Sequence, residues 1–272
     1  MKKESKEAIL LAAFGTTVPG SDRIFSDIEQ KVRRKYPGIP IGWAFTSKKI
    51  RTWALAKGKD LPPPETALAE LVAKGATHVA VLSLHIVQGE EFQKLCGQVE
   101  GFQAEGKGLK KFEIAGPLLS SHEDVEAVCE ILVRKFYRQD PHEGVIFVGH
   151  GNRRHVSDAI YVNMNSLLIA RRFGFFVGTV DGCSTPNDLL QELNAAGIKK
   201  VTLVPLMTIA GQHARQDMAG DEPESWKSVL AANGIDSESV FTGLAEDPNV
   251  VSIWLNHLDK AFASLSAGFC PL

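Results

Sequence analysis

Residues 144–151 read GVIFVGHG, an uninterrupted apolar run that ends in a histidine between two glycines. A strand that is apolar at successive positions, and not only at alternate ones, is typical of a parallel sheet covered on both faces. Residues 8–15, which read AILLAAFG, have the same character near the start of the chain. Both stretches therefore predict buried parallel strands.

Similar apolar runs alternate with amphipathic segments along the whole chain. The predicted strands are residues 8–14, 39–45, 78–84, 112–115, 145–148, 175–180 and 201–206. The predicted helices include residues 21–36, 64–73, 121–136, 156–173, 186–196 and 250–265. This alternation predicts an α/β protein with open parallel sheets that are flanked by helices.

Two alignments within the chain suggest that it folds the same unit twice. Residues 8–15 match residues 144–151, which sets Phe14 opposite His150. Residues 78–91 match residues 200–213, which sets Glu91 opposite His213. General likeness among βα units explains these matches equally well at this point.

A duplicated chain predicts two α/β domains. We place them at residues 1–140 and 141–272, because a polar stretch separates the two related halves near residues 139–143. The prediction leaves open that the last helix packs back on the first domain. Such an arrangement suits the length of 272 residues, at which a single hydrophobic core stops growing.

Composition excludes several classes of protein. The chain has 30 Lys and Arg against 32 Asp and Glu, so it lacks the basic excess of a nucleic-acid binder. No apolar run approaches the ~20 residues that span a bilayer. Glu4 and Glu7 make the first residues unlike a signal sequence, and the four cysteines are scattered. We therefore expect a cytoplasmic protein without nucleic-acid or membrane partners.

The polar residues of most interest follow predicted strands, where open α/β sheets bind ligands. They are His150, His213, Glu91 and Asp181. Two imidazoles with nearby carboxylates suit a borderline divalent ion such as cobalt, iron, nickel or zinc. Two alternatives stay open: the glycines around His150 form only a tight turn, or His213 is an ordinary surface histidine.

Other motifs are missing or weak. No glycine-rich phosphate loop follows the first strand, so nucleotide chemistry has no support. Arg153 and Arg154 adjoin His150 and could pair with substrate carboxylates, although most such clusters are solvated surface.

Several ordered blocks carry a family resemblance. They are FGT at 14–16, AFTS at 44–47, SLHI at 83–86 followed by GEEF at 89–92, GPLLSSH at 116–122, GHG at 149–151 and the stretch 205–227. With these blocks the chain resembles the anaerobic cobalt chelatases of cobalamin biosynthesis. These form the sirohydrochlorin cobaltochelatase family of class II chelatases, which is related to the ferrochelatases.

The resemblance implies two Rossmann-like, ferrochelatase-like halves with a cleft that holds a tetrapyrrole. It implies that His150 and His213 hold the incoming metal and that Glu91 assists proton transfer. Asp181 stands where the family usually has glutamate, and is a shorter candidate metal ligand. The implied tetrapyrrole-binding residues are Phe14, Thr16, His85 and Arg153.

The predicted function is insertion of cobalt(II), as substrate metal, into sirohydrochlorin without a nucleotide. Iron insertion into sirohydrochlorin or protoporphyrin, and a carrier of tetrapyrrole or metal without turnover, stay open as alternatives. A histidine-dependent phosphohydrolase is disfavoured, because the arginine pattern expected beside its histidine is missing. We expect a homo-oligomer, as is common for soluble enzymes. The resemblance leaves open whether a haem also binds.

Overall fold

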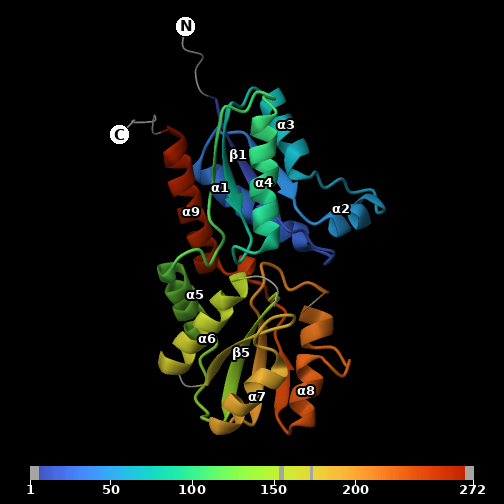
Figure 1. Cartoon of the computed structure of the whole chain (residues 1–272), viewed down its shortest axis with the longest axis vertical. Helices are drawn as coiled ribbons and strands as arrows, with labels where there is room; N and C mark the ends of the chain where they lie inside the picture. Colours follow the sequence, from blue (N-terminus) through green and yellow to red (C-terminus); the bar gives the residue numbers. More distant parts are fainter. Residues whose placement is uncertain (1–5, 153–155, 172–173, 213, 267–272) are drawn as a thin grey trace. The chain divides into compact units, whose positions relative to one another are not determined.

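A computed structural model describes residues 6–152, 156–171, 174–212 and 214–266 of the chain. Contacts divide the chain into two compact units (Figure 1). The first is Met1–Leu118 with Val251–Leu272, and the second is Leu119–Val250. Each unit contains one four-stranded sheet in which every neighbouring pair of strands is parallel.

The sheet of the first unit has the strand order β2-β1-β3-β4. The helices α3 and α4 cover one of its faces, where their apolar side chains join those of the strands in a single core (Figure 1). The elements are β1 (Glu7–Ala13), α1 (Ser21–Lys35), β2 (Ile41–Phe45), α2 (Lys48–Leu55), α3 (Pro64–Ala73), β3 (His78–Ser83), α4 (Glu90–Ala104), β4 (Lys111–Ile114) and most of α9 (Pro248–Ser266).

The sheet of the second unit has the order β6-β5-β7-β8. Its elements are α5 (His122–Lys135), β5 (Glu143–Gly149), η1 (Val156–Asp158), α6 (Ala159–Arg171), β6 (Phe175–Thr179), α7 (Pro186–Ala195), β7 (Lys200–Pro205), η2 (Ala214–Met218), α8 (Trp226–Ala232), β8 (Asp236–Ser239) and η3 (Leu244–Glu246). One core in this unit includes Trp226 of α8, which is 1% exposed and packs with side chains of β5 and α7.

The predicted fold class is confirmed: two parallel sheets are flanked by helices. The predicted duplication is confirmed in its topology. The first alignment pairs β1 with β5, and the second pairs β3 with β7, and these strands occupy the same places in the two orders.

The helix α5 groups with the second unit, and most of α9 groups with the first, as the sequence analysis allowed for the last helix. The domain ranges 1–140 and 141–272 stay a prediction. Within the first unit α9 is fixed by polar contacts. The carboxylate of Asp259 accepts hydrogen bonds from Tyr36 and Lys35 of the α1 end, and the Trp254 indole N–H donates to the carbonyl of His85.

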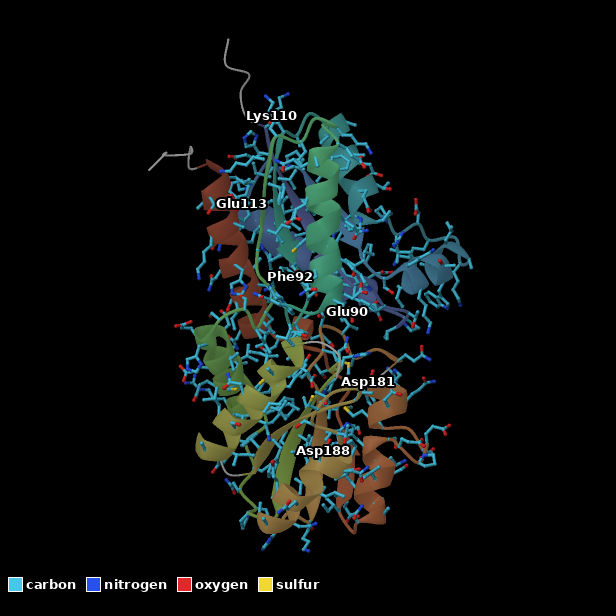
Figure 2. The ribbon with its side chains drawn as sticks, viewed as in Figure 1. Glu90, Phe92, Lys110, Glu113, Asp181 and Asp188 are labelled. Carbon is cyan, nitrogen blue, oxygen red and sulfur yellow. The ribbon has the colours of Figure 1, made fainter. Side chains whose placement is uncertain are left out.

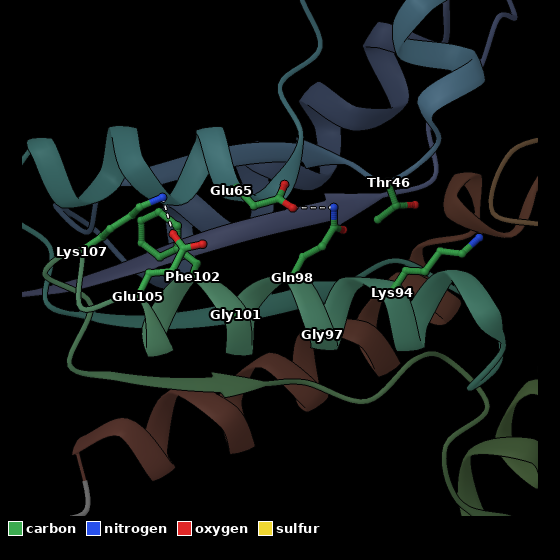
Figure 3. A pocket seen from close by; sticks show the side chains of 9 residues that line it. All are labelled: Thr46, Glu65, Lys94, Gly97, Gln98, Gly101, Phe102, Glu105 and Lys107. Atoms are coloured by element: carbon green, nitrogen blue, oxygen red, sulfur yellow. Dashed lines mark hydrogen bonds and ion pairs between the residues drawn. The ribbon is translucent and has the colours of Figure 1, made fainter.

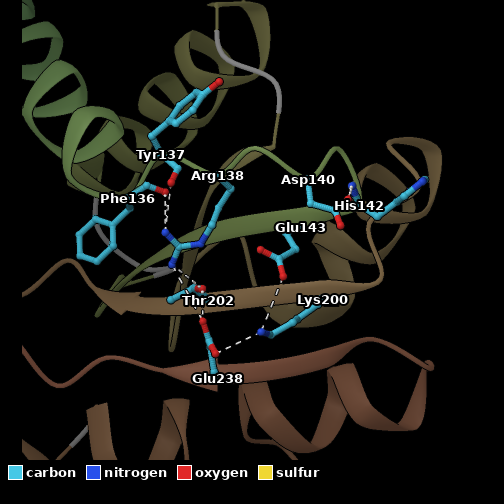
Figure 4. A network of polar contacts seen from close by, with 9 residues as sticks. All are labelled: Phe136, Tyr137, Arg138, Asp140, His142, Glu143, Lys200, Thr202 and Glu238. Atoms are coloured by element: carbon cyan, nitrogen blue, oxygen red, sulfur yellow. Dashed lines mark hydrogen bonds and ion pairs between the residues drawn. The ribbon is translucent and has the colours of Figure 1, made fainter.

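Strand β8 was not predicted, because Asp236–Ser239 is polar throughout and has no apolar alternation. It pairs with β7 at the edge of the sheet, where side chains reinforce the ladder (Figure 4). Glu238 accepts a hydrogen bond from the Thr202 hydroxyl at 2.9 Å and lies 3.3 Å from the Lys200 ammonium. Arg138 donates to the same hydroxyl at 3.0 Å. These contacts, the Thr202 bond first, lower the pKa of the Glu238 carboxyl.

Several predicted boundaries are confirmed by their caps. Ser121 and Asp124 form a capping box at the start of α5, with bonds of 3.1 and 3.0 Å. Gly75, Gly174 and Gly197 all have positive φ, as expected where helices stop. Helix α4 was not among the predicted helices, since Gly97 and Gly101 interrupt its pattern.

None of the helices in the described ranges combines the length and the apolar character needed to cross a bilayer.

Candidate functional site

His150 lies directly after β5, the strand that β6 and β7 flank, at the carboxyl end of the sheet. Its side chain is exposed, and its Nδ1 lies 2.9 Å from the carbonyl oxygen of Gly151. A carbonyl oxygen can only accept, so Nδ1 is the donor of this hydrogen bond and carries a hydrogen. The geometry therefore selects Nε2 as the nitrogen that could bind a metal ion.

Packing explains the glycines on either side of His150. A Cβ on Gly149 would lie 2.5 Å from Cε1 of Tyr161, and one on Gly151 would lie 2.7 Å from Cα of Gly182. Gly151 also has a φ of 73°, in the left-handed region that glycine tolerates best. The glycines thus let the loop run close to its neighbours, with the His150 side chain exposed.

Asp181 and His150 follow two neighbouring strands, β6 and β5, and are joined through their backbones. The backbone N–H of Asp181 donates to the carbonyl of His150 at 2.8 Å, and Val180 donates to Gly149 at 3.0 Å. These bonds continue the pairing of β6 with β5 beyond the strands themselves. Asp181 is exposed after β6 (Figure 2). The second unit therefore brings the backbones of His150 and Asp181 together at the end of the sheet.

Glu91 lies in the first turn of α4, next to Glu90 and Phe92 (Figure 2). Its Oε1 accepts a hydrogen bond from the Lys94 ammonium at 2.8 Å. Its Oε2 is buried and has no hydrogen-bond partner among the residues that the structure describes. The ion pair with Lys94 thus fixes the orientation of the Glu91 carboxylate at the start of α4.

His85 is buried, and each of its ring nitrogens faces a hydroxyl group. Nδ1 lies 2.8 Å from Oγ of Ser83, and Nε2 lies 3.3 Å from Oγ1 of Thr46. Burial lowers the pKa of His85 to about 4, against the opposing effect of the Glu91 carboxylate. The ring is therefore neutral near pH 7 and serves to link the ends of β2 and β3, a role that sequence reasoning missed.

Acidification is expected to lower the free energy of unfolding through His85. The folded-state pKa of about 4 is below the ordinary value of 6.5, so the unfolded chain takes up this proton first. The contribution of His85 is fully present above pH 6.5 and is lost as the pH falls toward 4. The shift corresponds to about 3 kcal/mol at most.

Urea unfolding of the wild type and of His85→Gln at pH 7.5 and pH 5 measures this contribution. Burial also lowers the pKa of His78, but that titration is common to both proteins and cancels in the difference. The wild type should lose more stability than His85→Gln between the two pH values. An equal loss in both proteins would show that His85 does not carry the effect.

Phe14 and Thr16 lie after β1, in the place that His150 occupies after β5. Phe14 is 45% exposed. Its backbone carbonyl accepts a hydrogen bond from the Ser47 N–H. The hydroxyl of Thr16 accepts a hydrogen bond from the backbone N–H of Val18 at 3.1 Å. An exposed aromatic ring at a strand end suits contact with a flat apolar ligand.

Two predicted site residues, His213 and Arg153, lie outside the described residues. Ala214, which follows His213, is buried at the start of a π-helical turn after β7. Among the residues that are described, no group of three or more His, Cys, Asp or Glu side chains forms a metal-binding cluster. Of the three expected metal ligands, His150 and Asp181 are therefore among the described residues, and His213 is not.

A groove of about 430 Å³ runs along α4 in the first unit (Figure 3). Gln98 crosses it to donate to Glu65 at 2.8 Å, and Gly97 and Gly101 leave one side open. The groove is lined by Thr46, Glu65, Lys94, Gly97, Gln98, Gly101, Phe102, Glu105 and Lys107. It was not predicted, and none of the predicted site residues lines it.

Two solved structures share the fold of this chain. The structure of SirB from Bacillus subtilis with Fe3+ matches with a TM-score of 0.65 at 17% identity, and covers 97% of this chain and 98% of that one. CbiX, described as the terminal enzyme for biosynthesis of sirohaem in denitrifying bacteria, matches with a TM-score of 0.60 at 14% identity over 93% and 99%. The two parallel sheets of this chain are thus arranged as in these two structures.

Sequence comparison then identifies the family. A family model described as cobalt chelatase (CbiK) matches residues 7–263. The sirohydrochlorin cobaltochelatase CbiKC of Nitratidesulfovibrio vulgaris is 37% identical over 96% of this chain and 92% of its own length. The sirohydrochlorin cobaltochelatase of Salmonella typhimurium is 33% identical over 94% and 96%. The chain belongs to the cobalt chelatase (CbiK) family and is a metal chelatase, an enzyme of the lyase class.

Proposed function

We propose that the chain inserts cobalt(II) into sirohydrochlorin in anaerobic cobalamin biosynthesis. The observation that carries this proposal is the match to the cobalt chelatase family over residues 7–263. Two relatives more than 30% identical over nearly their full lengths are named for the same reaction. The exposed His150 at the carboxyl end of β5 supplies a ligand type that cobalt favours.

The reaction replaces two pyrrole N–H protons of the macrocycle with the metal ion. The protein must therefore present the ion to the ring and accept protons from it. We assign presentation of cobalt to His150 and His213, with Asp181 as a further ligand. This assignment is supported by the Nδ1 hydrogen bond of His150, which points to Nε2 as the ligating atom, and by the backbone bond between Asp181 and His150.

Glu91 is our choice for the proton acceptor. Lys94 holds one carboxylate oxygen, so the side chain has a defined orientation without being neutralised by a proton. The other oxygen, Oε2, is buried and has no hydrogen-bond partner among the described residues. A carboxylate is one of the side chains that commonly act as a general base, which supports the choice.

The macrocycle is proposed to contact Phe14, Thr16, His85 and Arg153. The exposed ring of Phe14 suits the flat face of a tetrapyrrole. An arginine suits the carboxylates around its edge, because guanidinium binds them with two parallel hydrogen bonds. The predicted cleft that would hold the macrocycle stays a prediction, as do a cytoplasmic location, a homo-oligomeric state and the lack of a nucleotide requirement.

A metal competition assay with sirohydrochlorin tests the proposal. The purified chain is mixed with the macrocycle and with cobalt(II), iron(II) or both, and the absorbance of the product is followed. Cobalt is expected to be inserted faster than iron, over many turnovers per chain. Insertion of iron alone would show a ferrochelatase instead, and binding without turnover would show a carrier.

A further inference from the structure

Asp158 is a buried carboxylate that neither the family resemblance nor the proposed mechanism uses. It ends the short helix η1 (Val156–Asp158) and is 3% exposed. Its Oδ1 accepts a hydrogen bond from the backbone N–H of Asn152 at 3.1 Å, and its Oδ2 accepts one from Cys183 at 2.5 Å. A buried carboxylate keeps its charge only where such donors replace water.

The two donors come from different loops. Asn152 lies two residues after His150, in the loop that follows β5, and Cys183 lies two residues after Asp181, in the loop that follows β6. One carboxylate therefore joins the two segments that carry His150 and Asp181. Its contacts are to backbone atoms, so it acts on these side chains through the chain and not directly.

The contact between the loops leaves little room for movement. A Cβ on Gly182 would lie 2.6 Å from Oδ1 of Asp158 and 2.4 Å from Oγ1 of Thr179. A Cβ on Gly151 would lie 2.7 Å from Cα of Gly182. The loops are therefore packed glycine against glycine, with the Asp158 carboxylate beside them.

Tyr161 supports the same loop from the other side. Its ring fills the space against Gly149, where a Cβ would lie 2.5 Å from Cε1 of Tyr161. Burial raises the pKa of Tyr161, and the charge of Asp158 raises it further, so the hydroxyl stays protonated. The loop that carries His150 is thus packed closely at Gly149 and Gly151 and hydrogen-bonded at Asn152.

We propose that Asp158 is a positioning residue for metal insertion, which sets the spacing and orientation of His150 and Asp181 by holding the backbone of their two loops. This inference rests on the proposed function, because it assumes that His150 presents the metal ion. Groups that orient metal ligands without touching the ion typically change metal affinity or activity by about 10- to 100-fold when they are replaced.

The test compares Asp158→Ala and Asp158→Asn with a matched control, Asn165→Ala. Asn165 is also buried in the second unit, lies on α6, and accepts a hydrogen bond from the backbone N–H of Val177 at 2.7 Å. Its loss should destabilise the unit without touching either loop. Thermal unfolding gives the folded fraction, and all rates are expressed per folded molecule.

For Asp158→Ala we expect kcat/KM for cobalt to fall about 10- to 100-fold, with the KM for sirohydrochlorin nearly unchanged. Asp158→Asn should lie between this variant and the wild type, because its amide oxygen still accepts one of the two hydrogen bonds. The affinity of the chain for cobalt(II) alone, measured by titration calorimetry, should fall in the same order. Asn165→Ala should keep the wild-type values.

Equal kcat/KM for the Asp158 and Asn165 variants, per folded molecule, would overturn the inference and leave Asp158 a purely structural residue. If Asp158→Ala does not fold, the nearly isosteric Asp158→Asn decides by the same comparison. A wild type that inserts no cobalt contradicts the proposed function instead, so the two failures are distinguishable.

Discussion

Replacing His150 with alanine is expected to lower kcat/KM for cobalt insertion by at least about 100-fold. Replacement of groups that only orient metal ligands already costs about 10- to 100-fold, and a direct ligand should cost more. The effect should appear as weaker use of cobalt, while binding of sirohydrochlorin is largely kept. Initial rates at varied cobalt and fixed sirohydrochlorin measure it.

His142→Ala is the matched control for this prediction. His142 is an exposed histidine of the same unit that precedes β5, and its Nδ1 lies 3.0 Å from the carbonyl of Gly197. It stands at the opposite end of the strand from His150, where parallel sheets do not place ligands. Its replacement should leave cobalt insertion unchanged. Wild-type rates in His150→Ala would remove His150 from the ligand set.

Replacing Glu91 with glutamine is expected to lower kcat by about 100- to 10,000-fold, the range typical of losing a general base. Glutamine keeps the size of the side chain and can still accept a hydrogen bond from Lys94, but it cannot take up a pyrrole proton. The KM for cobalt should change little, because the proposed metal ligands are untouched. Single-turnover insertion followed by absorbance separates the proton-transfer step from binding.

Glu90→Gln controls for the loss of a carboxylate at the start of α4. Glu90 is the preceding residue of the same turn (Figure 2), and its replacement removes the same charge. A large fall in kcat for Glu91→Gln with little change for Glu90→Gln supports the assignment. Similar small effects in both variants would move the proton acceptor elsewhere.

Most of the fold could be predicted because buried parallel strands leave a clear apolar signal. For each strand from β1 to β7, the first and the last residue lie within two positions of those predicted. Strand β8 could not be predicted, since it is held at the sheet edge by Glu238 and its partners Thr202 and Lys200, and not by apolar burial. Helix α4 is stabilised by burial of Leu95 and Val99 despite its glycines.

The candidate site could be predicted in part, for a general reason. The rule that ligands bind at the carboxyl ends of parallel strands singled out His150 and Asp181, and their mutual contact follows from the pairing of β5 with β6. Nothing in the sequence pointed to a role for Asp158, because its hydrogen-bond partners are backbone N–H groups, which any sequence contains. The hydroxyl partners of His85 likewise depend on how β2 and β3 are paired through β1.

The identical strand orders of the two sheets have one more consequence. Two separate copies of a single-sheet protein would have to carry the same side chain after the first strand of each. A fused polypeptide is free of that requirement, and this one has phenylalanine at position 14 and histidine at position 150. Covalent linkage thus allows the chemistry of one half to diverge while the other keeps its own.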